Sequence, residues 1–212
     1  MLRLTQYPTP YLDPRMRYFI GLDLGQRRDY TAIAVIERGN ESLGRRDPAT
    51  MEWLTKTHQR LRYLERVPLG TAYPDVVARV RSIVTHPNIF TRCELIVDAT
   101  GVGLPVVDLI RAERLRCELF PVYIHGGDTT HKDGKNWRVP KRELITGLQV
   151  MLETGRLELA EGMEHGETLV KELRDMRVEV SLGGHESYGA WRQNQHDDLV
   201  LAVALATWRS NQ

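Results

Sequence analysis

The sequence predicts a single α/β domain with a central, mixed five-stranded sheet flanked by helices, and with a late β-hairpin. Three observations carry this prediction. Short apolar runs that end at turn residues are typical of strands, and runs with helical spacing separate the later ones. A strand-helix-strand order indicates parallel neighbours, whereas a short polar turn between the first two runs indicates an antiparallel pair. The chain has 212 residues, 42% of them hydrophobic, which is enough for one sizeable core.

The domain is expected to cover residues 18–212, and the proline-rich residues 1–17 are expected to be a linker or tail. The first strand is the apolar run 18–25, YFIGLDLG, and the second is 31–37, TAIAVIE. Residues 38–58 are polar and irregular, so we expect an extended excursion there. A third strand is expected at 60–68, where apolar and charged residues alternate.

The pattern then changes from strands to alternating helices and strands. Apolar residues recur at helical spacing after Pro74 and stop at His86-Pro87. The next elements are expected to be a strand over 93–98, a helix over about 104–114 and a strand over 117–124. Because this is a strand-helix-strand unit, the two strands should be parallel.

Helices dominate the rest of the chain. The expected elements are a basic loop over 125–138, a helix from Pro140 that Gly155 ends, a brief segment over 157–159, a helix around 168–176, and a hairpin of 178–182 with 187–191. Leu199–Trp208 is apolar except for Thr207, which predicts a helix buried on all sides. It opens with Asp197-Asp198, and acidic residues in a first turn are by themselves typical of an ordinary capped helix start.

Composition excludes several classes of protein. The net charge of +1 argues against a strongly basic binder, and the longest apolar run, eight residues, is far too short for a membrane helix. Only two cysteines are present, Cys93 and Cys117, which cannot form a disulfide framework or a zinc site. With no signal-peptide pattern in residues 1–17, we expect a cytoplasmic protein.

A basic segment, HKDGKNWRVPKR over residues 131–142, is the candidate nucleic-acid contact. Its basic residues are Lys132, Lys135, Arg138, Lys141 and Arg142. A solvated loop that leads into a helix is an equally good interpretation of this segment. His125, His131 and His196 are weaker candidates for proton transfer or DNA contact, since single histidines are more often surface residues.

Carboxylates stand at three critical places in the predicted fold. Asp23 lies in the first strand, Asp98 ends the fourth, and Asp197-Asp198 begin the buried helix. Each can be a turn or cap residue, but burying them together costs several kcal/mol unless a counter-charge is shared. The apolar runs hold no lysine or arginine, so a divalent metal is the economical counter-charge, and oxygen ligands favour Mg²⁺ or Mn²⁺. Two such ions suit phosphodiester cleavage.

The segments IGLDLGQRRDYTAIAVIE, ELIVDATGVG and SYGAWRQNQHDDLVLAVALATW, in this order, resemble the nuclease domain of the large terminase subunit of tailed phages. The resemblance covers about residues 18–210, and HDDLVLA is its most specific part. It implies a ribonuclease-H-like fold and a DNA endonuclease that cuts concatemeric viral DNA during packaging. It also implies that Asp23 and Asp98 are metal ligands, that Asp197, Asp198 or both supply the third ligand, and that the basic segment contacts phosphates of double-stranded DNA.

The chain departs from full-length terminase subunits in one respect. It holds no G-x-x-x-x-G-K-[ST] motif, since Asn136 follows Gly134-Lys135, so ATP-driven translocation is not expected of it. A packaging ATPase domain, a small terminase subunit and a portal are therefore expected as partners, with residues 1–17 as the remnant of a linker, unless the nuclease serves another purpose.

Three alternatives remain open. A Holliday-junction resolvase or transposase would share the fold and the acidic site. An actin-like or sugar-kinase ATPase lobe would use IGLDLG and DATGVG as phosphate-binding turns, although such proteins need two lobes and give Asp197-Asp198 no role. A non-catalytic module of the same fold is the third, but no carboxylate position is missing.

Overall fold

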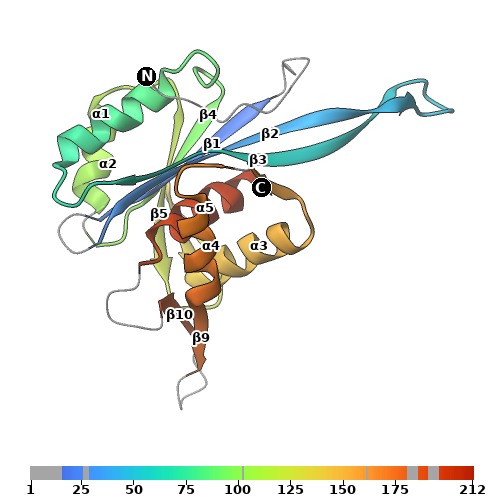
Figure 1. Cartoon of the computed structure of the whole chain (residues 1–212). Coiled ribbons are helices and arrows are strands. Elements are labelled where there is room, and N and C mark those ends of the chain that lie inside the picture. The colour runs from blue at the N-terminus through green and yellow to red at the C-terminus, as the bar shows by residue number, and fades with distance from the viewer. Residues whose placement is uncertain (1–15, 26–28, 102, 161, 181–185, 191–195) are drawn as a thin grey trace.

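The computed structural model describes residues 16–25, 29–101, 103–160, 162–180, 186–190 and 196–212, with the backbone alone for 177–180 and 186–190. A twisted sheet forms the middle of the molecule, and helices cover both of its faces (Figure 1). The elements are β1 (Arg17–Asp23), β2 (Thr31–Arg46), β3 (Trp53–Val67), α1 (Tyr73–Val84), β4 (Cys93–Asp98), α2 (Gly103–Ala112), β5 (Glu118–His125), β6 (His131–Asp133), β7 (Asn136–Pro140), α3 (Lys141–Glu153), β8 (Leu157–Leu159), α4 (Gly166–Asp175), β9 (Met176–Val180), β10 (Glu186–Ala190) and α5 (Asp198–Ser210).

The main sheet is mixed, as the sequence predicts, but it has eight strands in the described residues and not five. Its order is β6-β7-β5-β4-β1-β2-β3-β8. The five predicted strands form its centre, with β1 antiparallel to β2 and parallel to β4. The additional strands β6, β7 and β8 are only three to five residues long and lie toward the edges, so each is too short to show a clear strand pattern. Asp133-Gly134, with Gly134 at φ +60°, is a hairpin signal inside the predicted loop.

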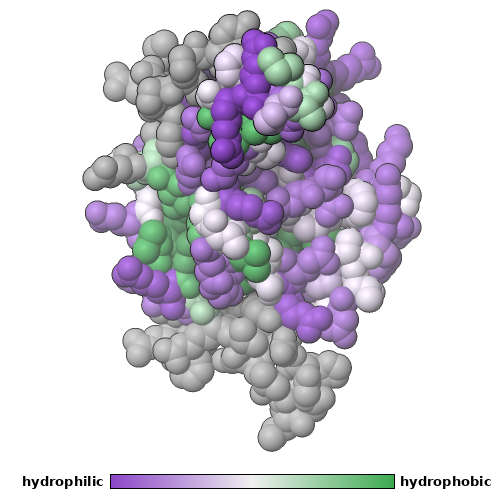
Figure 2. Space-filling model, turned by 90° about the vertical axis from the view of Figure 1, so that its right-hand side faces the viewer, coloured by the Kyte–Doolittle hydropathy of each residue, from purple (hydrophilic) through white to green (hydrophobic). Residues whose placement is uncertain are grey.

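The predicted irregular excursion at 38–58 is wrong for most of its length. Strands β2 and β3 continue their pairing to Arg46 and Trp53, and this hairpin projects from the body (Figure 1). Its outer part has no neighbouring layer to pack against, so its residues are mostly polar on both faces, its few apolar residues such as Leu43 and Trp53 are exposed, and it lacks the alternation that marks a half-buried strand. Seen along the hairpin, this side of the molecule is mostly hydrophilic (Figure 2).

Two hydrophobic cores sandwich the sheet. One contains residues of α1 and α2 together with Ile20 and Leu22 of β1, and the other contains residues of α3, α4 and α5 together with Phe19. Because side chains alternate along a strand, Gly21 and Asp23 point to the same face as Phe19, toward α5. The sequence therefore aims the end of β1 at the buried helix.

Helix α5 is the centre of the second core, and all of its residues except Arg209 are buried, as predicted. The predicted late hairpin is present as β9 and β10, but residues 181–185 and Trp191 lie outside the described residues. No helix in the described ranges combines the length and the apolar character needed to cross a membrane.

Candidate active site

A row of residues crosses the sheet at the carboxyl ends of β1 and β4. Asp23 of β1 pairs with Ala32 of β2, and Ala32 pairs with Arg66 of β3. On the other side, Leu22 pairs with Val97, so Asp98 follows next to Asp23. Two aspartates and one arginine thus lie in one row, with the small Ala32 between Asp23 and Arg66.

Close packing between β1 and α5 brings the start of the helix over this row. A Cβ atom added to Gly21 would lie 1.9 Å from the carbonyl oxygen of Ala202, so only glycine permits this approach. Asp198 stands one helical turn before Ala202, about 6 Å, and Asp23 stands two residues after Gly21, about 7 Å. The matched spacings place the helix start beside Asp23.

Asp198 is buried, with 3% of its surface exposed, and Arg66 binds both of its carboxylate oxygens. The Arg66 Nε lies 2.8 Å from Oδ2 and Nη2 lies 3.2 Å from Oδ1. The same guanidinium also contacts Glu172 of α4, whose Oε2 accepts a hydrogen bond from the Val200 amide at 3.3 Å. Glu172 therefore satisfies an amide of the first turn of α5, a role that the sequence does not reveal.

Asp197 occupies the N-cap position of α5 but forms no side-chain capping hydrogen bond. Its Oδ2 instead accepts a hydrogen bond from Lys141 Nζ at 2.7 Å. Lys141 is the first residue of α3, and it follows β7 directly. The two neighbouring aspartates thus have different partners, one from β3 and one from α3.

The acidic side chains of the site are buried close together, so their ionised forms are unfavourable. Burial, followed by the charges of Asp98, Asp197 and Asp198, raises the pKa of Asp23 well above its ordinary value. Burial also raises the pKa of Asp98, although hydrogen bonds with Thr100 and Asp23 oppose this shift. Carboxylates with raised pKa values in one place indicate a site that is stabilised by an added cation.

Two cations in the structure offset part of this charge. The apolar runs of the sequence contain no counter-charge, but Arg66 and Lys141 supply it from other elements. In the described part of the chain, no three acidic, histidine or cysteine side chains stand in an arrangement ready to hold a metal ion. Carboxylate oxygens are suited to Mg²⁺ or Mn²⁺. To bind a metal ion, however, the oxygens of Asp197 and Asp198 would have to exchange Lys141 and Arg66 for the ion.

Two glycines of the turns near the site have structural reasons for their identity. A Cβ atom at Gly25 would lie 2.2 Å from the Asp29 carbonyl oxygen, and one at Gly103 would lie 2.3 Å from the Asp98 carbonyl oxygen. Close contacts within the chain thus account for both glycines without a bound phosphate. This weakens the interpretation of IGLDLG and DATGVG as nucleotide-binding turns.

The basic residues predicted to bind DNA separate into two groups. Lys141 joins the carboxylates, whereas the other four are exposed on the β6-β7 hairpin and the start of α3. Lys132 lies over the Trp137 ring, Arg138 is 3.7 Å from Asp133, Arg142 is 3.1 Å from Asp128, and Lys135 is in the turn.

This hairpin is on the Asp98 side of the sheet, because β7 pairs with β5 and β5 pairs with β4. His196 packs against Tyr30, and His125 lies near His131. Residues 26–28 and 191–195, which belong to the sequence segments of the site, are outside the described ranges.

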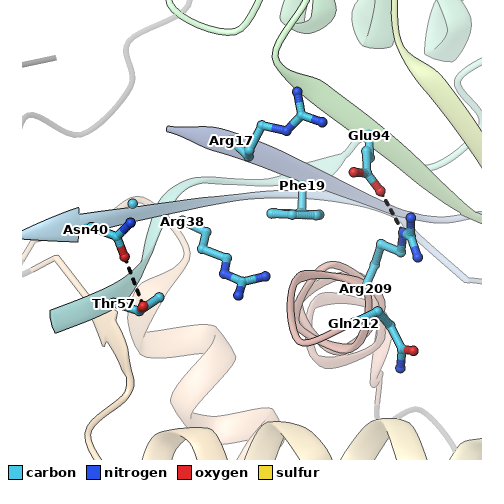
Figure 3. Close-up of a pocket in the computed structure, with 9 residues that line it drawn as sticks. Arg17, Phe19, Arg38, Asn40, Thr57, Glu94, Arg209 and Gln212 are labelled. Carbon is cyan, nitrogen blue, oxygen red and sulfur yellow. Dashed lines mark hydrogen bonds and ion pairs between the residues drawn. The ribbon is translucent and has the colours of Figure 1, made fainter. Parts of the chain in front are cut away.

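A pocket of about 310 Å³ lies at the opposite end of α5 (Figure 3). Two arginines that line the pocket hold the C-terminal end of α5 in place. Arg38 donates a hydrogen bond to the Ser210 carbonyl at 2.6 Å, and Arg209 pairs with Glu94 at 2.6 Å. The pocket is therefore separate from the acidic site.

No family model and no curated protein matches the sequence. Solved structures do match. The large terminase nuclease from thermophilic phage G20c with bound magnesium is 23% identical, with a TM-score of 0.62, and the match covers 98% of this chain and 93% of that one. A structure of the same nuclease with bound cobalt matches equally well.

Two further matches are more distant in sequence. The manganese-soaked terminase nuclease domain of human cytomegalovirus is 14% identical, with a TM-score of 0.55, over 98% of this chain and 89% of that one. The large terminase of bacteriophage HK97 is also 14% identical, with a TM-score of 0.55, over 96% of this chain but 40% of its own length. The chain therefore has the ribonuclease-H-like fold of terminase nuclease domains, which confirms the predicted fold class.

Proposed function

We propose that this chain is a metal-dependent DNA endonuclease of the terminase kind, which cuts concatemeric viral DNA during genome packaging. The observation that carries the proposal is the meeting of Asp23, Asp98 and the Asp197-Asp198 pair at one end of the sheet. The likeness to terminase nucleases, some of which contain magnesium, cobalt or manganese, supports it.

Asp23 and Asp98 would bind the metal from rigid neighbouring strands, and Asp197, Asp198 or both would complete the site from α5. Two bound Mg²⁺ or Mn²⁺ ions would supply an activated water and stabilise the leaving oxygen. The chain contributes rigidity, since β1, β4 and α5 pack tightly around Gly21, and Arg66 holds Asp198 in one orientation. Fixed ligands of this kind are what a catalytic metal site requires.

The exposed basic residues of the β6-β7 hairpin and the start of α3 would bind the phosphates of double-stranded DNA. Lys132, Lys135, Arg138, Lys141 and Arg142 lie on the side of the sheet where Asp98 stands, so a duplex held there would be close to the acids. A packaging ATPase domain, a small terminase subunit and a portal are the proposed partners.

Plasmid cleavage with Mn²⁺ or Mg²⁺ tests the nuclease. We expect Asp23→Asn, Asp98→Asn and Asp198→Asn each to lower cleavage at least about 100-fold, because each removes a ligand charge. Asp197→Asn, measured in parallel, assigns the third ligand by comparison with Asp198→Asn. Asp108→Asn is the matched control, since Asp108 is exposed on α2 and pairs only with Arg111 in the described residues. Circular dichroism checks folding.

Undiminished cleavage by the Asp23, Asp98 and Asp198 variants would refute the assignment of the site. Substrate choice distinguishes the proposed function from one of the alternatives, a junction resolvase. A terminase-like enzyme should cut linear and supercoiled duplexes, whereas strong preference for a four-way junction would favour a resolvase.

A further inference from the structure

Lys141 stands apart from the other basic residues of its segment. Its ammonium lies 2.7 Å from Asp197, and its side chain is only 25% exposed. Its positive charge also acts on Asp23 and Asp98, where it opposes the rise in the pKa of both carboxyls. Lys141 therefore acts on three of the four carboxylates, on Asp197 by direct contact and on Asp23 and Asp98 through its charge.

The position of Lys141 in its helix requires an explanation. It is the first residue of α3, and a cation at a helix N-terminus opposes the helix dipole. The neighbouring Arg142 turns instead to Asp128 at the surface. The contact of Lys141 with Asp197 therefore offsets an unfavourable helix position.

Arg66 and Lys141 differ in how firmly they hold their aspartates. Arg66 uses two nitrogens of a planar guanidinium on two oxygens of Asp198, and it is also bound to Glu172. In the described residues, Lys141 holds Asp197 by one hydrogen bond at the end of a flexible four-carbon chain. Exchange of partner is therefore easier at Asp197 than at Asp198.

We propose that Lys141 is a built-in counter-ion of the acidic site, which competes with the divalent metal for Asp197 and so sets the metal affinity of the enzyme. This inference rests on the proposed function, because it requires the carboxylates to bind a metal. A metal ion and the ammonium repel each other and use the same oxygen. Binding of the ion therefore moves Lys141 away from Asp197 and toward solvent, on the side of the DNA-binding hairpin.

Titration with Mn²⁺ in the absence of DNA, followed by calorimetry or by electron paramagnetic resonance, tests the competition. We expect Lys141→Met to bind Mn²⁺ about tenfold more tightly than the unmodified chain, since one nearby unit charge is removed from a partly buried site. Lys141→Arg should restore the ordinary affinity because it keeps the charge. Lys135→Met removes an equal charge from the exposed turn of the same hairpin and should leave the affinity unchanged.

Acetylation of lysine amines in the unmodified chain provides a second measurement, which does not depend on the folding of a variant. Addition of Mg²⁺ should increase the labelling of Lys141, while labelling of Lys135 stays constant. The two proposals fail in different ways. If the unmodified chain binds no Mn²⁺, the metal site is refuted and the competition with it. If the chain binds Mn²⁺ but Lys141→Met has the same or lower affinity, or Mg²⁺ leaves Lys141 labelling unchanged, the competition alone is refuted.

Discussion

Buried acidic side chains in this chain are stabilised by cations from distant parts of the sequence. Arg66 binds Asp198, and Arg62 binds Glu37, which is 2% exposed, at 3.2 Å. Asp23 is the exception among the buried acids of the described residues, since no lysine or arginine lies at salt-bridge distance from it. A buried carboxyl without such a partner is costly to ionise, and this contrast is the reason to place the metal beside Asp23.

Glu37 allows a prediction of pH dependence far from the acidic site. Burial alone would raise its pKa, but the contact with His58, 3.7 Å away, and the positive charge of Arg62 outweigh burial and lower the pKa from the ordinary 4.5. The folded chain then binds fewer protons than the unfolded chain, so this contribution to stability is present above about pH 4.5 and is lost as the pH falls below it. We expect Glu37→Gln to cost about 1–3 kcal/mol at pH 7 and to reduce the acid sensitivity.

Urea unfolding at a series of pH values between about 3 and 7 measures this effect. Glu52→Gln, at an exposed position near the tip of the long hairpin, is the control and should leave the curve unchanged. Parallel curves for Glu37→Gln and the unmodified chain would contradict the assignment of the lowered pKa to Glu37.

At the site, the contact between β1 and α5 leaves the least room for a side chain. Gly21 is buried in the middle of a strand, where glycine is normally unfavourable, and the sequence offers no local reason for it. The reason lies in α5, whose backbone approaches so closely that no side chain fits. The same approach sets the position of Asp198 relative to Asp23, so packing and proposed catalysis depend on one residue.

Gly21→Ala should therefore displace α5. We expect a loss of about 1–3 kcal/mol in the free energy of unfolding, because the new Cβ meets backbone atoms that cannot move alone, together with reduced metal-dependent cleavage. Gly147→Ala in α3 is the matched control, since its Cβ would meet nothing within 4 Å. It should stabilise the chain by about 0.5–1 kcal/mol through higher helix propensity. Equal stabilities of the two variants would contradict this account of the junction.

The charge of the chain is almost balanced, so any affinity for DNA must come from where its charges lie. Four exposed basic residues of the segment 131–142 gather at one edge of the sheet, and Lys141 links that edge to the acids. The long β2-β3 hairpin carries Arg45 and Lys56 on another part of the molecule. The two groups allow a local contact to be distinguished from a general effect of charge.

Lys132→Ala with Lys135→Ala should weaken DNA binding and make it less sensitive to salt. Each phosphate contact that is lost should lower the slope of log K against log salt by about 0.9. Fluorescence anisotropy of a labelled duplex with EDTA present measures the slope. Arg45→Ala with Lys56→Ala removes the same charge and should change the slope little. Equal slopes for the two double variants would place the DNA elsewhere.

Periodic burial is what made the centre of the fold predictable from sequence. The five central strands, the buried helix and the late hairpin were all expected, because apolar runs of the right length report which faces are covered. Strands β6 and β7 and the outer hairpin were not expected, and β8 was expected only as a brief segment over 157–159, since such strands are held by backbone pairing, which side-chain patterns do not record. The candidate aspartates were chosen from their places at strand ends and at the helix start, and their role stays a prediction.

The sequence determined the aspartates and the face of the sheet on which they lie, because alternation along β1 and β4 aims Asp23 and Asp98 at α5. Folding decided their partners. The register between β2 and β3 places Arg66 beside Asp198. Lys141 lies beside Asp197 because α3 begins where β7 ends, next to the site. Such pairings join residues that are 132 and 56 positions apart, and no local pattern encodes them. The ion pairs of the site therefore depend on tertiary packing, whereas the positions of its carboxylates follow from the sequence.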